Sequence, residues 1–249
     1  MAPRSVLVTG ANRGIGLGIV KQLISHKDIE IIIATCRDFE KAQELKSIND
    51  HRLHVLQLDV DSDEFDWISF FWVDEIVGEK GLTVLLNNAG ILLPYNVEEP
   101  IDRRTIIRQL ETNSVSVAII TQKFLPLLKK AAAQRNDESV SINRAAIINI
   151  SSTAASVEKI DGTFNGPLVA YRMSKSALNS FAKSCSIDLA KYHILVTSFC
   201  PGWVQTDMGG ANALLTVADA TKTLVDNILL LNGDHHGKFL QSDLQIIPN

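Results

Sequence analysis

The chain has 249 residues, of which 46% are hydrophobic and 21% charged, and this balance excludes an intrinsically disordered protein. Its formal net charge of -4, with dispersed basic residues, excludes an extended surface for nucleic acid or anionic membrane, so neither partner is expected. Three cysteines form neither a disulfide framework nor a close metal-ligand set, which favours a reducing compartment and predicts no metal site.

The amino terminus, Met1 to Ser5, leads directly into an apolar segment without the basic-then-apolar pattern of a signal peptide. No apolar run in the sequence approaches the roughly 18 residues that a membrane span needs. We therefore expect a cytoplasmic protein.

Short β-rich runs alternate with longer amphipathic stretches along the chain. Seven strands are predicted, at Ser5 to Thr9, Glu30 to Thr35, Leu53 to Leu58, Thr83 to Leu86, Ala145 to Ile150, Ile194 to Phe199 and Lys238 to Gln241. Several runs are continuously apolar, which is typical of parallel strands that are buried on both faces. The pattern predicts an α/β fold, a doubly wound Rossmann-type parallel sheet of about seven strands with helices on both faces. No linker or repeat divides the chain, so we expect a single domain over residues 1–249.

A glycine-rich segment, Thr9 to Gly16, follows the first predicted strand and opens a helix. Glycines let the backbone approach a phosphate closely, and the first turn of a helix presents free N–H groups to an anion. Three residues separate its first two glycines, whereas the common dinucleotide fingerprint has one. A tight turn without a ligand is the alternative. The setting predicts a pyrophosphate cradle with contacts from Gly10, Asn12, Arg13, Ile15 and Gly16.

The end of the second predicted strand bears on the type of cofactor. In NAD-binding folds a carboxylate at this point binds the ribose 2′-hydroxyl. Here Arg37, together with Arg13, presents guanidinium groups, which suit a 2′-phosphate. The sequence therefore favours NADP(H), although Asp38 would bring a carboxylate into reach if the strand ended slightly later.

Three further strand ends supply predicted cofactor contacts, because such folds bind ligands at the carboxyl ends of their strands. Asp59 and Val60 follow the third strand, where adenine would lie, although Asp59 could equally cap the next helix. After the fourth strand, amide side chains can brace neighbouring strands and small residues can admit the nicotinamide riboside, at Asn88, Ala89 and Gly90. After the sixth strand a Pro-Gly turn can approach the nicotinamide, with predicted contacts from Pro201, Gly202, Val204 and Thr206.

Tyr171 and Lys175 lie four residues apart, which places an ammonium one helical turn from a phenol. A nearby cation favours the phenolate and is expected to lower the phenol pKa from its usual value near 10. The pair alone would fit a half-buried tyrosine with a snorkelling lysine. Neither of the other two tyrosines has a lysine four residues further on, so Tyr171 is the candidate proton donor.

With these motifs in this order, the chain resembles the classical short-chain dehydrogenase/reductase family from Ser5 to about Met208. The resemblance rests on Thr-Gly-x-x-x-Gly-x-Gly at Thr9, Asn-Asn-Ala-Gly at Asn87, Tyr-x-x-x-Lys at Tyr171 and Pro-Gly at Pro201. Cys36-Arg37 and the sequences around Tyr171 and Pro201 are similar to those of the sniffer-type carbonyl reductases, which are related to bacterial C-factor proteins.

The resemblance implies a catalytic tetrad of Asn, Ser, Tyr and Lys. Asn113 matches the family's Asn, and Ser152 matches its Ser, with Ser151 as the alternative. Tyr171 would then protonate a carbonyl oxygen during hydride transfer, Ser152 would orient that oxygen, and Lys175 would hold the ribose hydroxyls. Asn113 would position a water molecule. Ser152 and Tyr171 are 19 residues apart, more than is usual in the family, so Ser156 to Pro167 is expected to be an inserted loop beside the substrate.

The predicted function is that of an NADPH-dependent carbonyl reductase, and the resemblance supplies the substrate class, a small-molecule aldehyde, ketone or quinone. One alternative is an NAD(P)-dependent alcohol or hydroxysteroid dehydrogenase, and another is a non-catalytic dinucleotide-sensing protein. The resemblance also implies a homodimer, which would associate through two long helices at Asp102 to Ala131 and Pro167 to Lys191.

Overall fold

The computed structural model describes residues 2–62, 65–160 and 166–248, which hold a single parallel sheet. Its strands are β1 (Ser5–Val8), β2 (Ile31–Cys36), β3 (Leu53–Gln57), β4 (Val84–Asn87), β5 (Ala146–Ile150), β6 (Leu195–Cys200) and β7 (Phe239–Gln241). Neighbouring strands pair in parallel in the order β3-β2-β1-β4-β5-β6-β7. The predicted doubly wound parallel sheet is confirmed, and no predicted strand end differs from the observed end by more than one residue.

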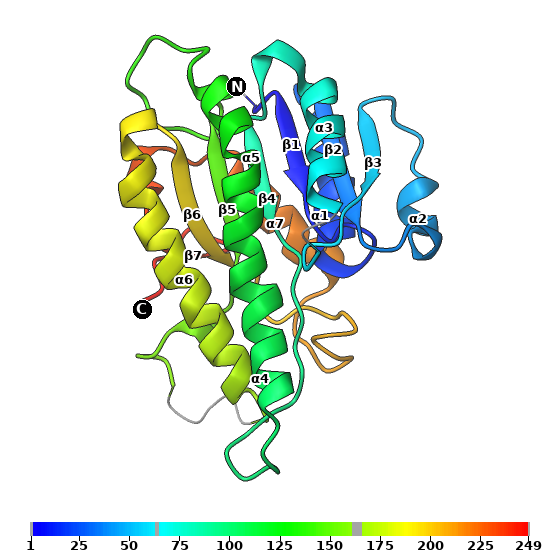
Figure 1. The fold of residues 1–249 in the computed structure, drawn as a ribbon, viewed down its shortest axis with the longest axis vertical. Coiled ribbons are helices and arrows are strands. Elements are labelled where there is room, and N and C mark those ends of the chain that lie inside the picture. The colour runs from blue at the N-terminus through cyan, green and yellow to red at the C-terminus, as the bar shows by residue number, and fades with distance from the viewer. Residues whose placement is uncertain (1, 63–64, 161–165, 249) are drawn as a thin grey trace.

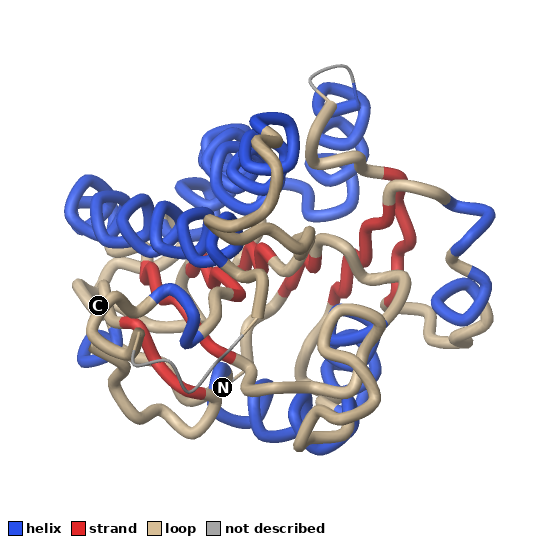
Figure 2. Tube along the Cα trace, turned by 90° about the horizontal axis from the view of Figure 1, so that it is seen from below, coloured by secondary structure: helices blue, strands red, loops and turns tan. Residues whose placement is uncertain are grey.

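Helices cover both faces of the sheet, as Figure 2 shows. They are α1 (Gly14–Ser25), α2 (Gln43–Lys46), α3 (Phe65–Val77), α4 (Arg103–Leu110), α5 (Ser116–Ala132), α6 (Val169–Leu189) and α7 (Val217–Ile228). In Figure 1, α5 and α6 run side by side in front of the central strands. Among the described residues, no helix combines the length and hydrophobicity that crossing a bilayer requires.

The core consists of two apolar layers, one on each face of the sheet. Successive strand residues point to opposite faces, so Val6 and Val8 pack with α1 and α7, whereas Leu7 packs with α3, α5 and α6. Both sets of side chains are almost completely buried. A strand that is buried on both faces is predominantly apolar, which is why these strands could be predicted from nearly continuous apolar runs.

The predicted helix from Asp102 to Ala131 contains a π-turn (Glu111–Val115) between α4 and α5. Asp102 begins this helix as its N-cap, since its carboxylate accepts hydrogen bonds from the N–H groups of Arg104 and Thr105 at 3.0 and 3.2 Å. No feature of the sequence pattern predicted the π-turn. Such a turn changes the hydrogen-bond register without requiring any particular residue type.

The carboxyl ends of the strands form one edge of the sheet, and the loops that leave it carry the predicted site residues. This edge lies toward the bottom of Figure 1 and faces the viewer in Figure 2. The loop after β4 pairs with the entry to α6, because Tyr95 N–H donates to Pro167 O at 2.7 Å and Val169 N–H donates to Tyr95 O at 3.0 Å. Of the loop predicted at Ser156 to Pro167, residues 161–165 lie outside the described residues.

Candidate functional site

The glycine-rich turn between β1 and α1 forms a close-packed cradle. Gly10 and Gly14 have positive φ angles of 63° and 53°, which glycine adopts without strain. A Cβ on Gly16 would lie 2.3 Å from Gly10 O and 2.5 Å from Asn88 Nδ2, so no larger residue fits there. Helix α1 has no side-chain cap and no acidic residue in its first turn, which leaves its positive end open to an anion.

The residues after β4 brace this cradle from the neighbouring strand. The Asn88 side chain donates to Thr9 O at 2.8 Å and to Gly10 O at 3.0 Å. The backbone N–H groups of Asn88 and Ala89 both donate to Thr9 Oγ1, at 3.0 and 3.1 Å. A Cβ on Gly10 would lie 2.9 Å from Ala89 Cα. The bracing predicted for the amide side chains is therefore present, and Thr9 takes a central part in it that sequence reasoning missed.

At the end of β2, Arg37 and Asp38 differ in what their side chains do. Asp38 accepts a hydrogen bond from Glu40 N–H at 3.0 Å and lies 3.1 Å from Lys41 Nζ, and this lysine is the largest cause of a lowered pKa for Asp38. The carboxylate thus caps the short 3₁₀ turn that follows β2. The exposed Arg37 side chain makes no ion pair within the described part of the chain, and the backbone carbonyl of Arg37 accepts from Gln57 Nε2 at 3.0 Å.

Arg13, the second predicted phosphate contact, lies in the glycine-rich turn directly before α1. Its guanidinium forms an ion pair with Asp207, and both side chains are largely exposed. Thr206 lies beside the same turn, since a Cβ on Gly14 would lie 3.3 Å from its methyl group. The segment after β6 therefore closes against the glycine-rich turn.

The other residues predicted after β6 are also at this edge. Gly202 has a φ of 87°, and a Cβ there would lie 2.7 Å from Leu215 Cδ1. Val204 is buried and forms an isolated bridge with Leu215. Trp203 and Met208 are roughly half exposed, and Trp203 Nε1 donates to Gly209 O at 2.7 Å.

Asp59 and Val60 follow β3 at the same edge of the sheet and are partly buried. Asp59 does not begin the next helix, because α3 starts only at Phe65. Its Oδ1 instead accepts from Asp61 N–H at 3.3 Å within the loop. Of the two roles that the sequence left open, the helix cap is therefore excluded.

Tyr171 and Lys175 are both buried on the face of α6 that packs on the sheet, one turn apart. Lys175 Nζ donates to Ile150 O at 2.8 Å and lies 5.9 Å from the centre of the Tyr171 ring. The hydroxyl of Ser152, and not that of Ser151, hydrogen-bonds to the Tyr171 phenol. Ser151 Oγ is buried without a partner among the described residues.

The pKa values of this pair are shifted mainly by burial. Burial raises the pKa of Tyr171 to about 12, and the hydrogen bond with Ser152 offsets part of this shift. Burial lowers the pKa of Lys175 to about 8. The net shift of the Tyr171 pKa is therefore upward, opposite to the direction expected from a neighbouring lysine, because loss of hydration is its largest cause.

Asn113 lies in the π-turn and is fully buried. Its Oδ1 accepts from Ile91 N–H at 2.8 Å, while its Nδ2 donates to Ile91 O at 2.8 Å and to Ser174 Oγ at 2.9 Å. Ser174 donates in turn to Tyr171 O at 2.8 Å. The side chain thus joins the loop after β4 to α6 and has no free donor left.

Gly90 lies between the tetrad and the cradle. A Cβ on Gly90 would lie 3.1 Å from Asn113 Oδ1 and 3.5 Å from Lys175 Nζ, and its neighbour Ala89 contacts Gly10. The structure therefore brings the tetrad predicted from the resemblance to the same strand edge as the predicted cradle. The linking roles of Ile91 and Ser174 were missed, because contacts between residues far apart in sequence leave no local pattern.

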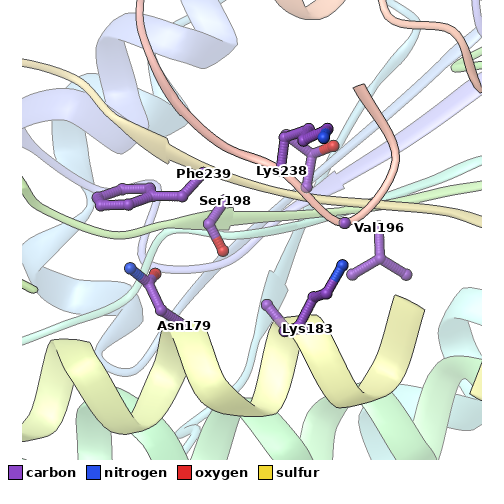
Figure 3. Close-up of a pocket in the computed structure, with 9 residues that line it drawn as sticks. Asn179, Lys183, Val196, Ser198, Lys238 and Phe239 are labelled. Atoms are coloured by element: carbon purple, nitrogen blue, oxygen red, sulfur yellow. The ribbon is translucent and has the colours of Figure 1, made fainter. Parts of the chain in front are cut away.

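A small cavity lies on the same face of the sheet, further along α6. It has a volume of about 10 Å³ and lies between α6, β6 and the entry to β7. Figure 3 shows Asn179 of α6 and Ser198 of β6 pointing toward one another into it. Neither the Asn179 amide nor the Ser198 hydroxyl has a hydrogen-bond partner among the described residues.

The comparisons with solved structures cover essentially the whole chain. It is 45% identical to the Sniffer protein of Caenorhabditis elegans, with a TM-score of 0.93 and 100% of both chains covered. It is 36% identical to the carbonyl reductase Sniffer of D. melanogaster, with a TM-score of 0.94 and coverage of 99% and 100%. It is 34% identical to an NADPH-bound carbonyl reductase from chicken fatty liver, with a TM-score of 0.95 and coverage of 100% and 95%.

Comparisons of sequence agree with this result. The chain is 33% identical to the C-signal of Myxococcus xanthus over 165 residues, which cover 66% of this chain and 91% of that protein. It is 28% identical to the human short-chain dehydrogenase/reductase family 9C member 7, of whose length it spans 62%. The family model described as short chain dehydrogenase matches residues 4–214. Because that match includes the strands β1 to β6 and every predicted tetrad position, the chain belongs to the short-chain dehydrogenase family of oxidoreductases.

Proposed function

We propose that this protein is an NADPH-dependent carbonyl reductase that reduces an aldehyde, ketone or quinone, with Tyr171 as the proton donor. The observation that carries the proposal is the buried Tyr171 phenol, hydrogen-bonded to Ser152 and one turn from Lys175, beside the glycine-rich cradle. The 34% identity to an NADPH-bound carbonyl reductase supports the choice of cofactor and substrate class.

The residues present fit the proposed cofactor. No side chain fits at Gly10 or Gly16, so the backbone there stays accessible to a phosphate, and the uncapped N-terminus of α1 suits a pyrophosphate. Arg37 would hold the 2′-phosphate, since Asp38 is occupied in capping a turn and does not offer its carboxylate to a ribose. When bound, NADPH supplies the hydride that reduces the carbonyl carbon.

The side chains of the tetrad then have distinct tasks. With a pKa of about 12, Tyr171 keeps its proton at neutral pH and can donate it to the oxygen of the substrate. Ser152 would donate a hydrogen bond to the same oxygen and so fix its position. Lys175 would hold the ribose hydroxyls near Gly90, and Asn113 would keep the loop at Ile91 in place.

Activity of a Tyr171→Phe variant tests the proposal. NADPH oxidation is followed with a panel of aromatic aldehydes, ketones and quinones. Wild-type protein should oxidise NADPH with at least one of them, and Tyr171→Phe should lower kcat by about 100-fold or more, because the general acid is lost. Tyr192→Phe is the control, since Tyr192 lies in the turn after α6 and outside the site. Equal activity of Tyr171→Phe and wild type, or no wild-type turnover with any carbonyl, would contradict the proposal.

We also propose that the chain acts as one catalytic domain and forms a homodimer. All described strands belong to one sheet, which supports a single domain. Apolar side chains are exposed on the helices that the resemblance assigns to the interface, namely Ile107, Val115, Ile119, Met173 and Ile187. Sedimentation equilibrium that gives the mass of a single chain at micromolar concentration would exclude the dimer. A cytoplasmic location stays a prediction.

A further inference from the structure

Asp61, in the loop after β3, is a buried carboxylate with three side-chain partners. Its side chain is only 8% exposed. Arg108 Nη2 lies 2.8 Å from Oδ2, and Thr112 Oγ1 donates to the same oxygen at 3.0 Å. Ser116 Oγ donates to Oδ1 at 2.7 Å. Arg108 belongs to α4, Thr112 to the π-turn and Ser116 to α5, so one carboxylate holds the helix before, within and after the π-turn.

These three contacts favour the π-turn over a regular α-helix. In an α-helix, residues eight positions apart, such as Arg108 and Ser116, point in directions that differ by about 80°. A π-turn has more residues per turn than an α-helix. Side chains four and eight residues apart, here those of Thr112 and Ser116 relative to Arg108, therefore point in more nearly the same direction from the helix axis. Asp61 can contact all three side chains at once because they project from the same side of the helix.

We propose that Asp61 is a positioning residue for the reaction, because it fixes the π-turn that carries Asn113. Thr112 of this turn and Ser116 directly after it both donate to the carboxylate. Asn113 lies between them and joins Ile91 to Ser174, and so to the backbone of Tyr171. Asp61 itself contacts no reacting group. The inference rests on the proposed function.

The same residue ties the turn to the cofactor side of the site. Asp61 follows Asp59 and Val60, the residues that the sequence predicts near the adenine, and its N–H donates to Asp59 Oδ1 at 3.3 Å. A single residue therefore connects the loop at the predicted adenine end to the turn that contains Asn113, through its backbone on one side and its carboxylate on the other.

Hydrogen exchange of the π-turn tests the structural half of the proposal without any need for turnover. In Asp61→Ala, the backbone amides of residues 112–116 should exchange about tenfold or more faster than in wild type, because the turn and the helices on either side of it lose three side-chain contacts. Asp61→Asn keeps one oxygen acceptor and should give an intermediate rate. Asp50→Asn is the matched control, since Asp50 is a similarly buried carboxylate, 11% exposed and paired with Arg52. Wild-type exchange in Asp61→Ala would overturn the proposal.

Kinetics test the functional half. Asp61→Ala should lower kcat for the carbonyl by about tenfold, with NADPH affinity, measured by fluorescence titration, changed much less. Asp61→Asn should recover part of the loss, and Asp50→Asn should behave as wild type. A kcat equal to that of wild type, or an equal loss in Asp50→Asn, would overturn the positioning role. If wild-type protein reduces no carbonyl, the proposed function fails, while the exchange result still decides whether Asp61 holds the turn.

A milder variant covers the case in which Asp61→Ala does not fold. Thr112→Val combined with Ser116→Ala removes both hydroxyl partners and leaves the carboxylate paired with Arg108. This double variant should show the same faster exchange at residues 112–116 and the same direction of change in kcat. Unchanged exchange in a folded double variant would overturn the proposal as well.

Discussion

At the scale of single residues, the two titratable groups of the site are shifted in opposite directions by the same cause. Burial disfavours the charged form of each group, which raises the pKa of Tyr171 to about 12 and lowers the pKa of Lys175 to about 8. Near neutral pH the phenol is therefore protonated, and a modest rise in pH discharges the lysine. The protein on its own is thus arranged to donate a proton from Tyr171.

The shift at Lys175 predicts how stability depends on pH. Between the folded pKa of about 8 and the ordinary value of 10.5, the unfolded chain binds a proton that the folded protein has released. The free energy of unfolding therefore rises with pH in this window, by about 2 kcal/mol between pH 8 and 10. Lys175→Met should lack this rise, which urea unfolding at a series of pH values measures.

Lys183→Met is the control for this prediction, since Lys183 is an exposed lysine on the same helix. Other groups that titrate between pH 8 and 10 contribute equally to all three proteins and cancel in the comparison. If wild type and Lys175→Met give parallel curves of unfolding free energy against pH, then Lys175 is not discharged by burial.

The site residues that could be predicted from the sequence are those that lie close together along the chain or belong to a family motif. The four-residue spacing of Tyr171 and Lys175 is converted into proximity by helix geometry alone. The pairing of Arg13 with Asp207 spans most of the chain, so nothing near Arg13 in the sequence indicates it. The direction of the Tyr171 pKa shift was also missed, because it depends on burial, which a spacing does not reveal.

At the scale of secondary-structure elements, the strands were predictable and the π-turn was not. Parallel strands between two helix layers are mostly apolar, so the sequence marks them to within a residue. The π-turn depends on contacts such as those between Asp61 and the residues around Thr112, which come from another part of the chain. Because tertiary contacts stabilise the π-turn, the residues within it show no hydrophobic periodicity from which it could be predicted.

Strand β6 carries a hydroxyl whose removal should not destabilise the protein. Ser198 is 2% exposed and its Oγ has no partner among the described residues, so the folded state bears the cost of its burial. Ser198→Ala should leave the free energy of unfolding unchanged or raise it by up to about 1 kcal/mol. Chemical denaturation of the two proteins measures the difference.

Ser5 of β1 provides the matched control, because it is an equally buried strand serine with partners. Its Oγ accepts from Thr83 N–H at 2.9 Å and donates to Thr83 Oγ1 at 3.3 Å. Ser5→Ala leaves that buried N–H unpaired and should cost about 1–3 kcal/mol. Equal losses in the two variants would show that the Ser198 hydroxyl is satisfied after all.

At the scale of the whole molecule, the proposed cofactor would span the sheet edge from the end of β2 to the segment after β6. A ligand that binds the folded protein alone stabilises it by about 2.7 kcal/mol at 100 times its Kd. For a chain of this size, such a gain raises Tm by roughly 5–10 °C. Thermal unfolding therefore reports cofactor binding without requiring a substrate.

The preference for NADPH over NADH can be read from the same measurement. At equal cofactor concentrations, NADPH should raise the Tm of the wild-type protein by several degrees more than NADH does, because only NADPH offers a 2′-phosphate to Arg37. Arg37→Ala should remove most of this difference and leave the shift with NADH nearly unchanged. Arg135→Ala serves as a control, since Arg135 lies in the loop after α5 and pairs with Asp137. Equal shifts with both cofactors in the wild type would instead mean that the end of β2 does not discriminate between them, and the proposed NADP(H) specificity would have to be abandoned.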